Sequence, residues 1–138
     1  DFSNFTLPTK THYDNLPDKI KDCLVKLNSI PKNHNLQFGY RVANEIALYI
    51  NNTKQNISED LPTLFRALDY QLIQKVFPKL NGTYAVLEQP LKELLLYFSG
   101  TKEIYNIQPE GTNYPKTVSK LLRMYKSLST KGHASFIE

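Results

Sequence analysis

One arginine stands where a phosphate-binding residue could be. The stretch LQFGYRVANEIALYI, Leu36–Ile50, reads as an amphipathic helix from Tyr40 onward, with Arg41 in its first turn. That end of a helix is the positive end of its dipole, so a cation there costs about 0.3–1 kcal/mol. A guanidinium group is always charged and presents a planar set of donors to phosphate oxygens. These residues alone favour a simpler interpretation, an exposed pair with Glu45 four residues later.

Two further groups of cations could contact the phosphate of a nucleotide or of DNA. Lys75 and Lys79 flank a Phe-Pro pair. For these two lysines we favour the simpler interpretation, cations at the solvated end of a helix, where they suit the negative end of its dipole. A basic helix followed by an extended segment, as at the end of the chain, could read nucleic acid in helix-turn-helix style. Long basic side chains that cover apolar flanks are the simpler interpretation, and we favour it. The final segment has one acidic residue, Glu138, against Lys116, Lys120, Arg123, Lys126 and Lys131.

No complete catalytic or metal-binding arrangement is visible. The loop G-x-x-x-x-G-K-[ST] is missing, so the chain alone is not expected to hold a triphosphate in the Walker manner. Three scattered histidines and one cysteine, Cys23, give no metal-ligand spacing, and Cys23 reads as a small buried residue. We therefore expect no independent enzyme, no metal site and no cofactor bound by this chain alone.

Five helices are expected to position these residues. Periodicity and breakers predict them over about residues 17–29, 40–52, 62–77, 90–98 and 115–130. Pro31 and Pro78 are expected to end the first and third, Leu80–Thr83 to form a turn, and Gly132 to cap the last. The final ASFIE reads as a short extended segment. Sustained period-two alternation is missing, so the predicted class is all-α, with one core.

Composition sets the remaining limits. The 138 residues are enough for one domain, and 41% hydrophobic with 22% charged residues is typical of a globular protein. A net charge of +4 is compatible with nucleic acid or nucleotide phosphates. No apolar run approaches a membrane span. The polar start, residues 1–15, reads as a linker or an extended lead-in from a preceding region, and residues 16–138 as the helical domain. The first residue is Asp rather than Met, from which we expect a piece of a longer protein.

Three stretches carry a resemblance to a known family. They are FGYRVANEIALYI, ALDYQLIQKVFPKLNGT and VSKLLRMYKSLSTKGHASFIE. Their order resembles that of the region after the ATPase core in McrB-like proteins, the AAA+ NTPases of modified-cytosine restriction systems. The resemblance covers about Leu16 to Glu138, and its most specific parts are KVFPKLNGT and SKLLRM with GHASF. Phe77 and Asn81 depart from the Leu and His of the family, and His133 from an aromatic residue.

The resemblance implies a helical lid with a C-terminal extension. It implies that Arg41 is the sensor 2 arginine, which contacts nucleotide phosphates, with Gly39 allowing the tight turn before it and Glu45 in support. The parent protein would use GTP or ATP with Mg²⁺, form a ring, and work in the cytoplasm. Its partners would be its own NTPase core, neighbouring subunits, a nuclease subunit and DNA. The alternative is a helical nucleic-acid- or protein-binding module without nucleotide function.

Overall fold

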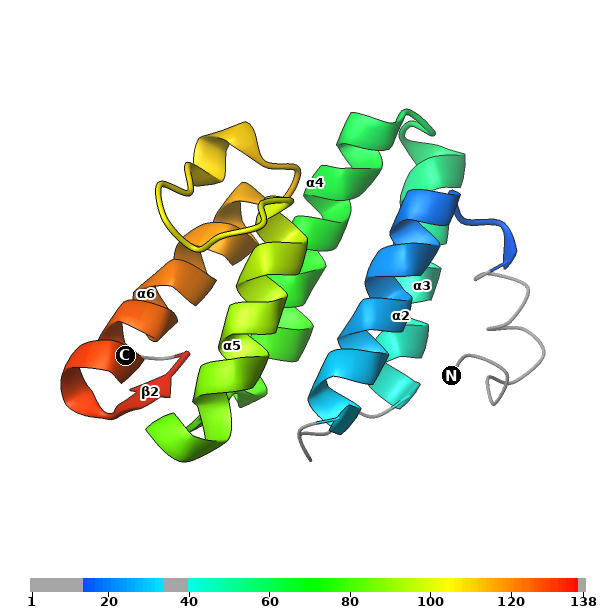
Figure 1. Cartoon of the computed structure of the whole chain (residues 1–138). Coiled ribbons are helices and arrows are strands. Elements are labelled where there is room, and N and C mark those ends of the chain that lie inside the picture. The colour runs from blue at the N-terminus through cyan, green and yellow to red at the C-terminus, as the bar shows by residue number, and fades with distance from the viewer. Residues whose placement is uncertain (1–13, 34–39, 137–138) are drawn as a thin grey trace. The chain divides into compact units, whose positions relative to one another are not determined.

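The computed structural model describes residues 14–33 and 40–136, and they are mostly helical (Figure 1). These residues form five α-helices and one two-stranded sheet, which confirms the predicted mostly α-helical class. The chain divides into two compact units, of which the first ends at Gln71 and the second begins at Leu72. The expected linker over residues 1–15 lies almost wholly outside the described residues.

The first unit holds three helices: α2 (Asp18–Asn33), α3 (Tyr40–Asn56) and α4 (Leu61–Gln71). Helix α4 contacts both α2 and α3. Ile20, Cys23, Leu24 and Leu27 share one face of α2 and are buried, so the expectation of a buried Cys23 is confirmed. The prediction that Pro31 ends this helix is wrong, since α2 continues to Asn33. A proline removes one backbone donor, its own N–H to the carbonyl four residues earlier, but the residues after it keep their own donors and can continue the helix.

The start of α4 shows a local cap that explains why a helix begins there. The Asp60 carboxylate accepts hydrogen bonds from the Thr63 backbone N–H at 3.3 Å and from the Thr63 hydroxyl at 3.0 Å. A side-chain acceptor at this position satisfies a backbone donor that the first turn leaves unpaired. The preceding helix, α3, runs four residues beyond its predicted end at Asn52.

The second unit begins with two short turns that continue the helical path. The π-helical turn η2 (Leu72–Val76) is followed by the 3₁₀ turn η3 (Phe77–Lys79). Pro78 lies inside η3, so the predicted third helix stays helical to Lys79 but changes its winding on the way. The remaining elements are β1 (Asn81–Thr83), α5 (Tyr84–Ser99), η4 (Pro109–Gly111), α6 (Pro115–Lys131) and β2 (His133–Ser135).

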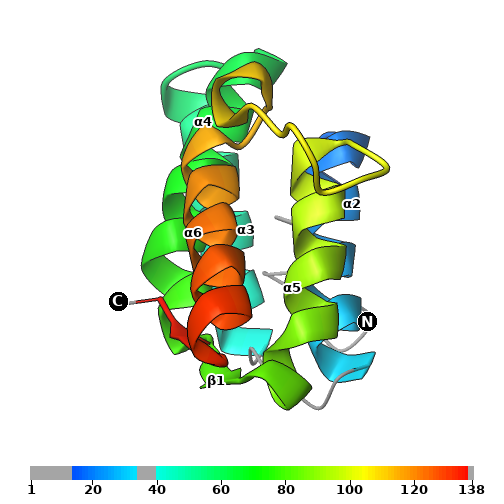
Figure 2. The same cartoon turned by 60° about the vertical axis from the view of Figure 1, so that its left-hand side comes forward.

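A small antiparallel sheet joins the middle of the chain to its end. Its register pairs Asn81 with Ser135, Gly82 with Ala134 and Thr83 with His133. Figure 2 shows β1 where it leads into α5. Of the expected extended segment at residues 134–138, Ala134 and Ser135 lie in β2, Phe136 is in a turn, and residues 137–138 lie outside the described residues. The prediction of a turn at Leu80–Thr83 is wrong, because residues 81–83 are a strand. A three-residue strand is too short to show alternation in the sequence.

Helices α5 and α6 pack on each other in the second unit (Figure 1). Helix α5 begins at Tyr84, six residues before its predicted start at Pro90. Pro90 lies inside the helix and is buried, along with Leu87 one turn earlier. The apolar stripe of α5 therefore continues on both sides of Pro90, although this residue has no backbone N–H. This continuity explains why α5 does not begin at Pro90. Helix α6 matches its prediction, and Gly132 caps it in the left-handed conformation.

An aromatic cluster forms part of the core of the second unit. The ring of Phe98 meets those of Phe77, Tyr97 and Tyr114 edge to face, with centroids 5.9, 5.2 and 5.0 Å away. This geometry brings the positive edge of one ring to the negative face of another, and each such pair is worth about 0.5–1.5 kcal/mol beyond burial. The cluster links η3, α5 and the residue just before α6.

Candidate functional site

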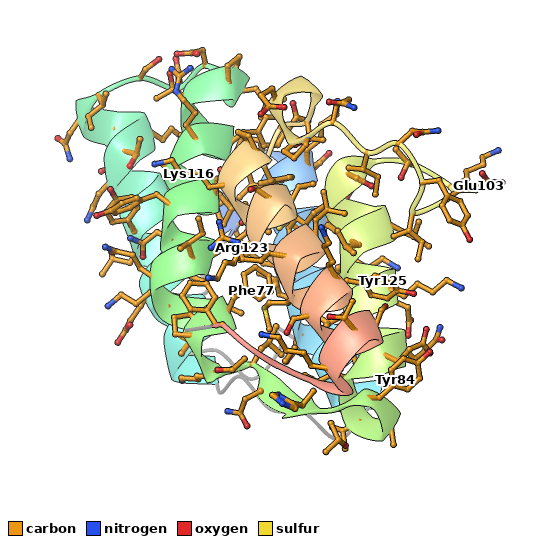
Figure 3. The ribbon with its side chains drawn as sticks, turned by 90° about the vertical axis from the view of Figure 1, so that its left-hand side faces the viewer. Phe77, Tyr84, Glu103, Lys116, Arg123 and Tyr125 are labelled. Carbon is orange, nitrogen blue, oxygen red and sulfur yellow. The ribbon has the colours of Figure 1, made fainter. Side chains whose placement is uncertain are left out.

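The last helix separates apolar from basic residues along its length. Its buried positions are Thr117, Val118, Leu121, Met124 and Leu128. Lys116, Lys120 and Arg123 follow the spacing i, i+4, i+7, which places them on one flank. Figure 3 shows Lys116 and Arg123 on this flank and Tyr125 on the other. Helix α6 therefore presents a row of three cations beside its apolar stripe.

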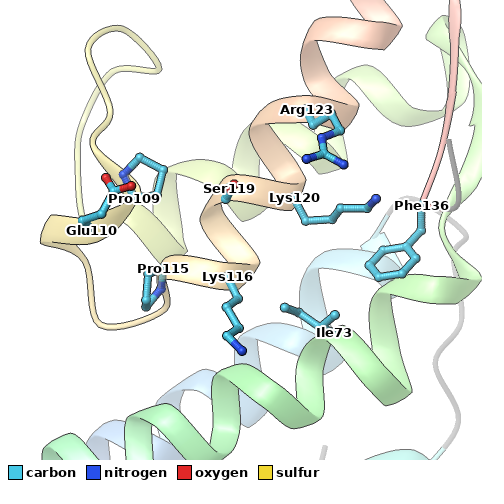
Figure 4. Close-up of a pocket in the computed structure, with 9 residues that line it drawn as sticks. All are labelled: Ile73, Pro109, Glu110, Pro115, Lys116, Ser119, Lys120, Arg123 and Phe136. Carbon is cyan, nitrogen blue, oxygen red and sulfur yellow. The ribbon is translucent and has the colours of Figure 1, made fainter.

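These cations line a surface pocket that lies within the second unit (Figure 4). Its volume is about 420 Å³. Three segments complete its walls: η2 through Ile73, η4 through Pro109 and Glu110, and the residue after β2, Phe136. Among the lining residues there are three cations and a single carboxylate. The pocket is therefore suited to an anion.

Lys120 occupies a distinctive place in this pocket. Its ammonium nitrogen lies 4.6 Å from the centroid of the Phe136 ring, a cation–π contact. Burial, and secondarily the positive charge of Arg123, lower the pKa of Lys120 from its ordinary value. Both effects disfavour the ammonium form, so an anion placed beside Lys120 and Arg123 would relieve the repulsion between them.

The backbone fixes the position of Phe136. Its N–H donates a hydrogen bond to the carbonyl of Leu80 at 3.2 Å, directly after the β1–β2 pairing. The Tyr84 N–H similarly donates to the Gly132 carbonyl at 2.7 Å, at the other end of the strand pair. The small sheet thus holds the aromatic ring against the basic flank of α6.

The structure brings some of the predicted phosphate contacts together and separates others. Lys120 and Arg123 line the pocket with Lys116. Lys75 in η2 and Lys79 in η3 are exposed and do not line it. Both lie in the last turn of their short helical elements, where a cation suits the negative end of the dipole, and their proposed contact with phosphate stays a prediction.

The residues of the predicted nucleotide contact lie in the first unit. Arg41 is the second residue of α3, so its predicted place in the first turn of a helix is confirmed. Gly39 lies outside the described residues. Glu45 is exposed on α3. The predicted roles of these three residues stay predictions.

Sequence reasoning missed the aromatic wall of the pocket. The spacing of Lys116, Lys120 and Arg123 is visible in the sequence and indicates one helix flank. Phe136 gives no such signal, because its place depends on the pairing of β2 with a strand about fifty residues earlier. Ile73 lies half-buried at the pocket wall.

Two features of the described residues bear on other kinds of site. In residues 14–33 and 40–136 there is no group of three or more His, Cys, Asp or Glu side chains that could hold a metal ion. Among the helices in these same ranges, none is both long enough and apolar enough to span a membrane.

Fold and pocket together define a mostly helical protein with a basic pocket edged by an aromatic ring. Residues 2–133 match the family model described as Domain of unknown function (DUF8727), and the chain belongs to this family. The matched range includes the three cations of the pocket and ends before Phe136. No curated protein and no solved structure matches the chain.

Proposed function

We propose that this chain is the C-terminal helical lid region of a McrB-like AAA+ NTPase. The observation that carries the proposal is the pairing of the two stretches most specific to the resemblance. KVFPKLNGT contributes β1, and GHASF contributes β2, and these strands pair with each other. Two separate stretches of the resemblance therefore meet in one small structural unit, which supports the proposal that both belong to one lid.

Arg41 is the residue that we propose acts on nucleotide. Its position in the first turn of α3 is the one that the resemblance implies for the sensor 2 arginine, and a guanidinium can donate two parallel hydrogen bonds to phosphate oxygens. In the transition state of phosphoryl transfer, a cation that meets developing charge in a water-poor cleft is worth several kcal/mol. Gly39 and Glu45 have supporting roles in this proposal. The parent protein binds GTP or ATP with Mg²⁺ in its core, forms a ring in the cytoplasm, and works with a nuclease subunit on DNA.

The first test is the coding sequence upstream of Asp1. The proposal requires a Walker A loop and an acidic Walker B strand there, because this chain supplies neither. A coding sequence without them overturns the proposal. The purified 138-residue chain should hydrolyse neither GTP nor ATP, and turnover well above background would equally contradict a lid.

The second test is Arg41→Ala in the full-length protein. Turnover should fall by at least about tenfold, and the melting temperature should change little. Arg41→Lys should rescue turnover only in part, because a point charge cannot reproduce two parallel hydrogen bonds. The matched control is Arg66→Ala, which removes an exposed arginine from α4. Normal turnover in Arg41→Ala, or equal losses in both alanine variants, would remove Arg41 from the mechanism.

The alternative function is a helical nucleic-acid- or protein-binding module without nucleotide function. It predicts a full-length protein with no nucleotide turnover and with Arg41 dispensable. Nucleotide turnover of the full-length protein and the effect of Arg41→Ala therefore distinguish the lid from the binding module.

A further inference from the structure

The pocket on α6 has the parts of a nucleotide-binding site, and none of them belongs to the proposed contact at Arg41. Its volume of about 420 Å³ falls within the range of small-ligand sites, about 300–1,000 Å³. All of its lining residues belong to the second unit, from Ile73 to Phe136. The candidate site therefore lies entirely within the second unit.

The charge in the pocket is arranged asymmetrically. Figure 4 shows Glu110 on the η4 side, whereas the Lys120 side chain is directed toward Phe136 with Arg123 on the neighbouring turn. An anion between Lys120 and Arg123 would therefore contact two cations. It would also lie away from the Glu110 carboxylate, because Lys120 is between them. Ser119, exposed on the same helix, adds a hydroxyl donor to the lining.

An aromatic ring next to cations favours a nucleotide over a simple anion. Sites for single-stranded nucleic acid combine a basic groove along the backbone with aromatic side chains on which bases stack. Phe136 is half-buried and lines the pocket, and its backbone is held by the hydrogen bond to Leu80. Such a ring loses little freedom on binding, which favours contact with a flat base.

We propose that this pocket binds one nucleotide unit, with its phosphate ester between Lys120 and Arg123 and its base against Phe136. The source is either a single-stranded nucleic acid or a free nucleotide, since both carry this chemistry. Binding is salt-dependent and indifferent to sequence, because the contacts are to phosphate and to the face of a base. An acidic peptide could satisfy the cations but would make no use of the ring.

The test measures fluorescence anisotropy of a labelled single-stranded DNA of about 15 nucleotides with the 138-residue chain. The pocket variant is Lys120→Gln with Arg123→Gln. The control variant is Lys126→Gln with Lys131→Gln, which removes two exposed cations of the same helix that do not line the pocket. Circular dichroism establishes that both variants fold. The two variants lose equal charge, so only a localised site distinguishes them.

The pocket variant should bind at least about tenfold more weakly, and the control should change less than about threefold. The slope of log affinity against log salt should fall by about 1.4 in the pocket variant, since each contact to a single strand contributes about 0.7. Phe136→Leu should weaken binding severalfold with little change in this slope. Equal losses in pocket and control variants overturn the proposal, as does a wild-type chain that fails to bind at about 50 mM salt.

Competitors identify the source of the nucleotide unit. Displacement of the labelled strand by AMP, at concentrations where inorganic phosphate has no effect, supports a free nucleotide. Displacement by unlabelled strand alone supports a nucleic acid. Polyglutamate that competes as well as the strand would overturn the proposal, because it would show that charge alone explains the binding. Duplex DNA that binds as tightly as the single strand would contradict the contact with Phe136.

Discussion

The ammonium nitrogen of Lys120 lies 4.6 Å from the centroid of the Phe136 ring, so a cation of α6 faces an aromatic ring from the end of the chain. The contact joins α6 to the residue directly after β2, and α6 and β2 also contact each other. It also explains how a lysine can be half-buried beside Arg123, since the negative face of the ring compensates part of the cost.

A double-mutant cycle should detect this contact in the unfolding free energy. Phe136→Leu and Lys120→Met each remove one partner and keep an apolar side chain. The coupling energy between them should be about 0.5–1 kcal/mol, the value for a partly exposed cation–π pair. Urea denaturation of the four proteins gives this number. A coupling indistinguishable from zero would show that the lysine stem packs on the ring without help from its charge.

Phe98 should be among the most sensitive positions of the second unit. It is 2% exposed and makes three edge-to-face ring contacts. Phe98→Ala should lower the unfolding free energy by about 3–5 kcal/mol, because it removes buried surface and leaves a cavity. Phe98→Leu keeps most of the volume and should cost about 1–1.5 kcal/mol. Equal losses in the two variants, measured by urea denaturation, would show that filling the cavity contributes nothing.

Local signals allowed the sequence to predict α6 well and α5 poorly. Pro115 lies at the start of an uninterrupted apolar stripe and Gly132 directly after its end. Both ends of α6 could therefore be predicted from local residues. Pro90 looked like a first-turn proline, but Leu87 extends the stripe of α5 back across it. A proline in the sequence identifies a missing backbone N–H. It does not predict whether the packing around it keeps the helix continuous.

The pocket was only half predictable, for a physical reason. Lys120 and Arg123 follow a local helical spacing, which a sequence shows directly. Phe136 and Ile73 reach the pocket through packing between segments far apart in the chain. Strand pairing over such a separation depends on the register Asn81 with Ser135, which three-residue strands do not reveal through alternation.

Gly132 should tolerate substitution poorly, although its surroundings are open. Its φ of 81° lies in the left-handed region, and its N–H donates to the Leu128 carbonyl at 2.9 Å to close α6. Gly132→Ala should cost about 1–2 kcal/mol, because a Cβ strains this conformation. Gly111→Ala is the control, since that site has neither positive φ nor a neighbour within 4 Å of an added Cβ. Its cost should stay within about 0.5 kcal/mol. Similar melting temperatures for the two variants would contradict the role of the cap.

Tyr125 should ionise at a higher pH than an ordinary tyrosine phenol, because its pKa is raised. Burial is the main cause that raises its pKa above the ordinary value of 10.0, and the charges of Glu88, Tyr84 and Tyr105 add to it. The folded chain therefore holds this proton more tightly than the unfolded chain does. The resulting stability is present in full below pH 10 and is lost as the pH rises through the folded pKa.

Alkaline titration of the tyrosinate absorbance measures this pKa by difference between the wild type and Tyr125→Phe. The difference curve should have its midpoint above 10.0. The same difference is measured in Glu88→Gln, with and without Tyr125→Phe. Its midpoint should fall only part of the way toward the ordinary value, because burial of Tyr125 remains. Glu103→Gln removes an exposed carboxylate that does not act on Tyr125, so it should leave the midpoint unchanged. A wild-type midpoint at or below the ordinary value would show that water reaches the phenol. A full return to that value in Glu88→Gln would instead make the carboxylate, rather than burial, the main cause.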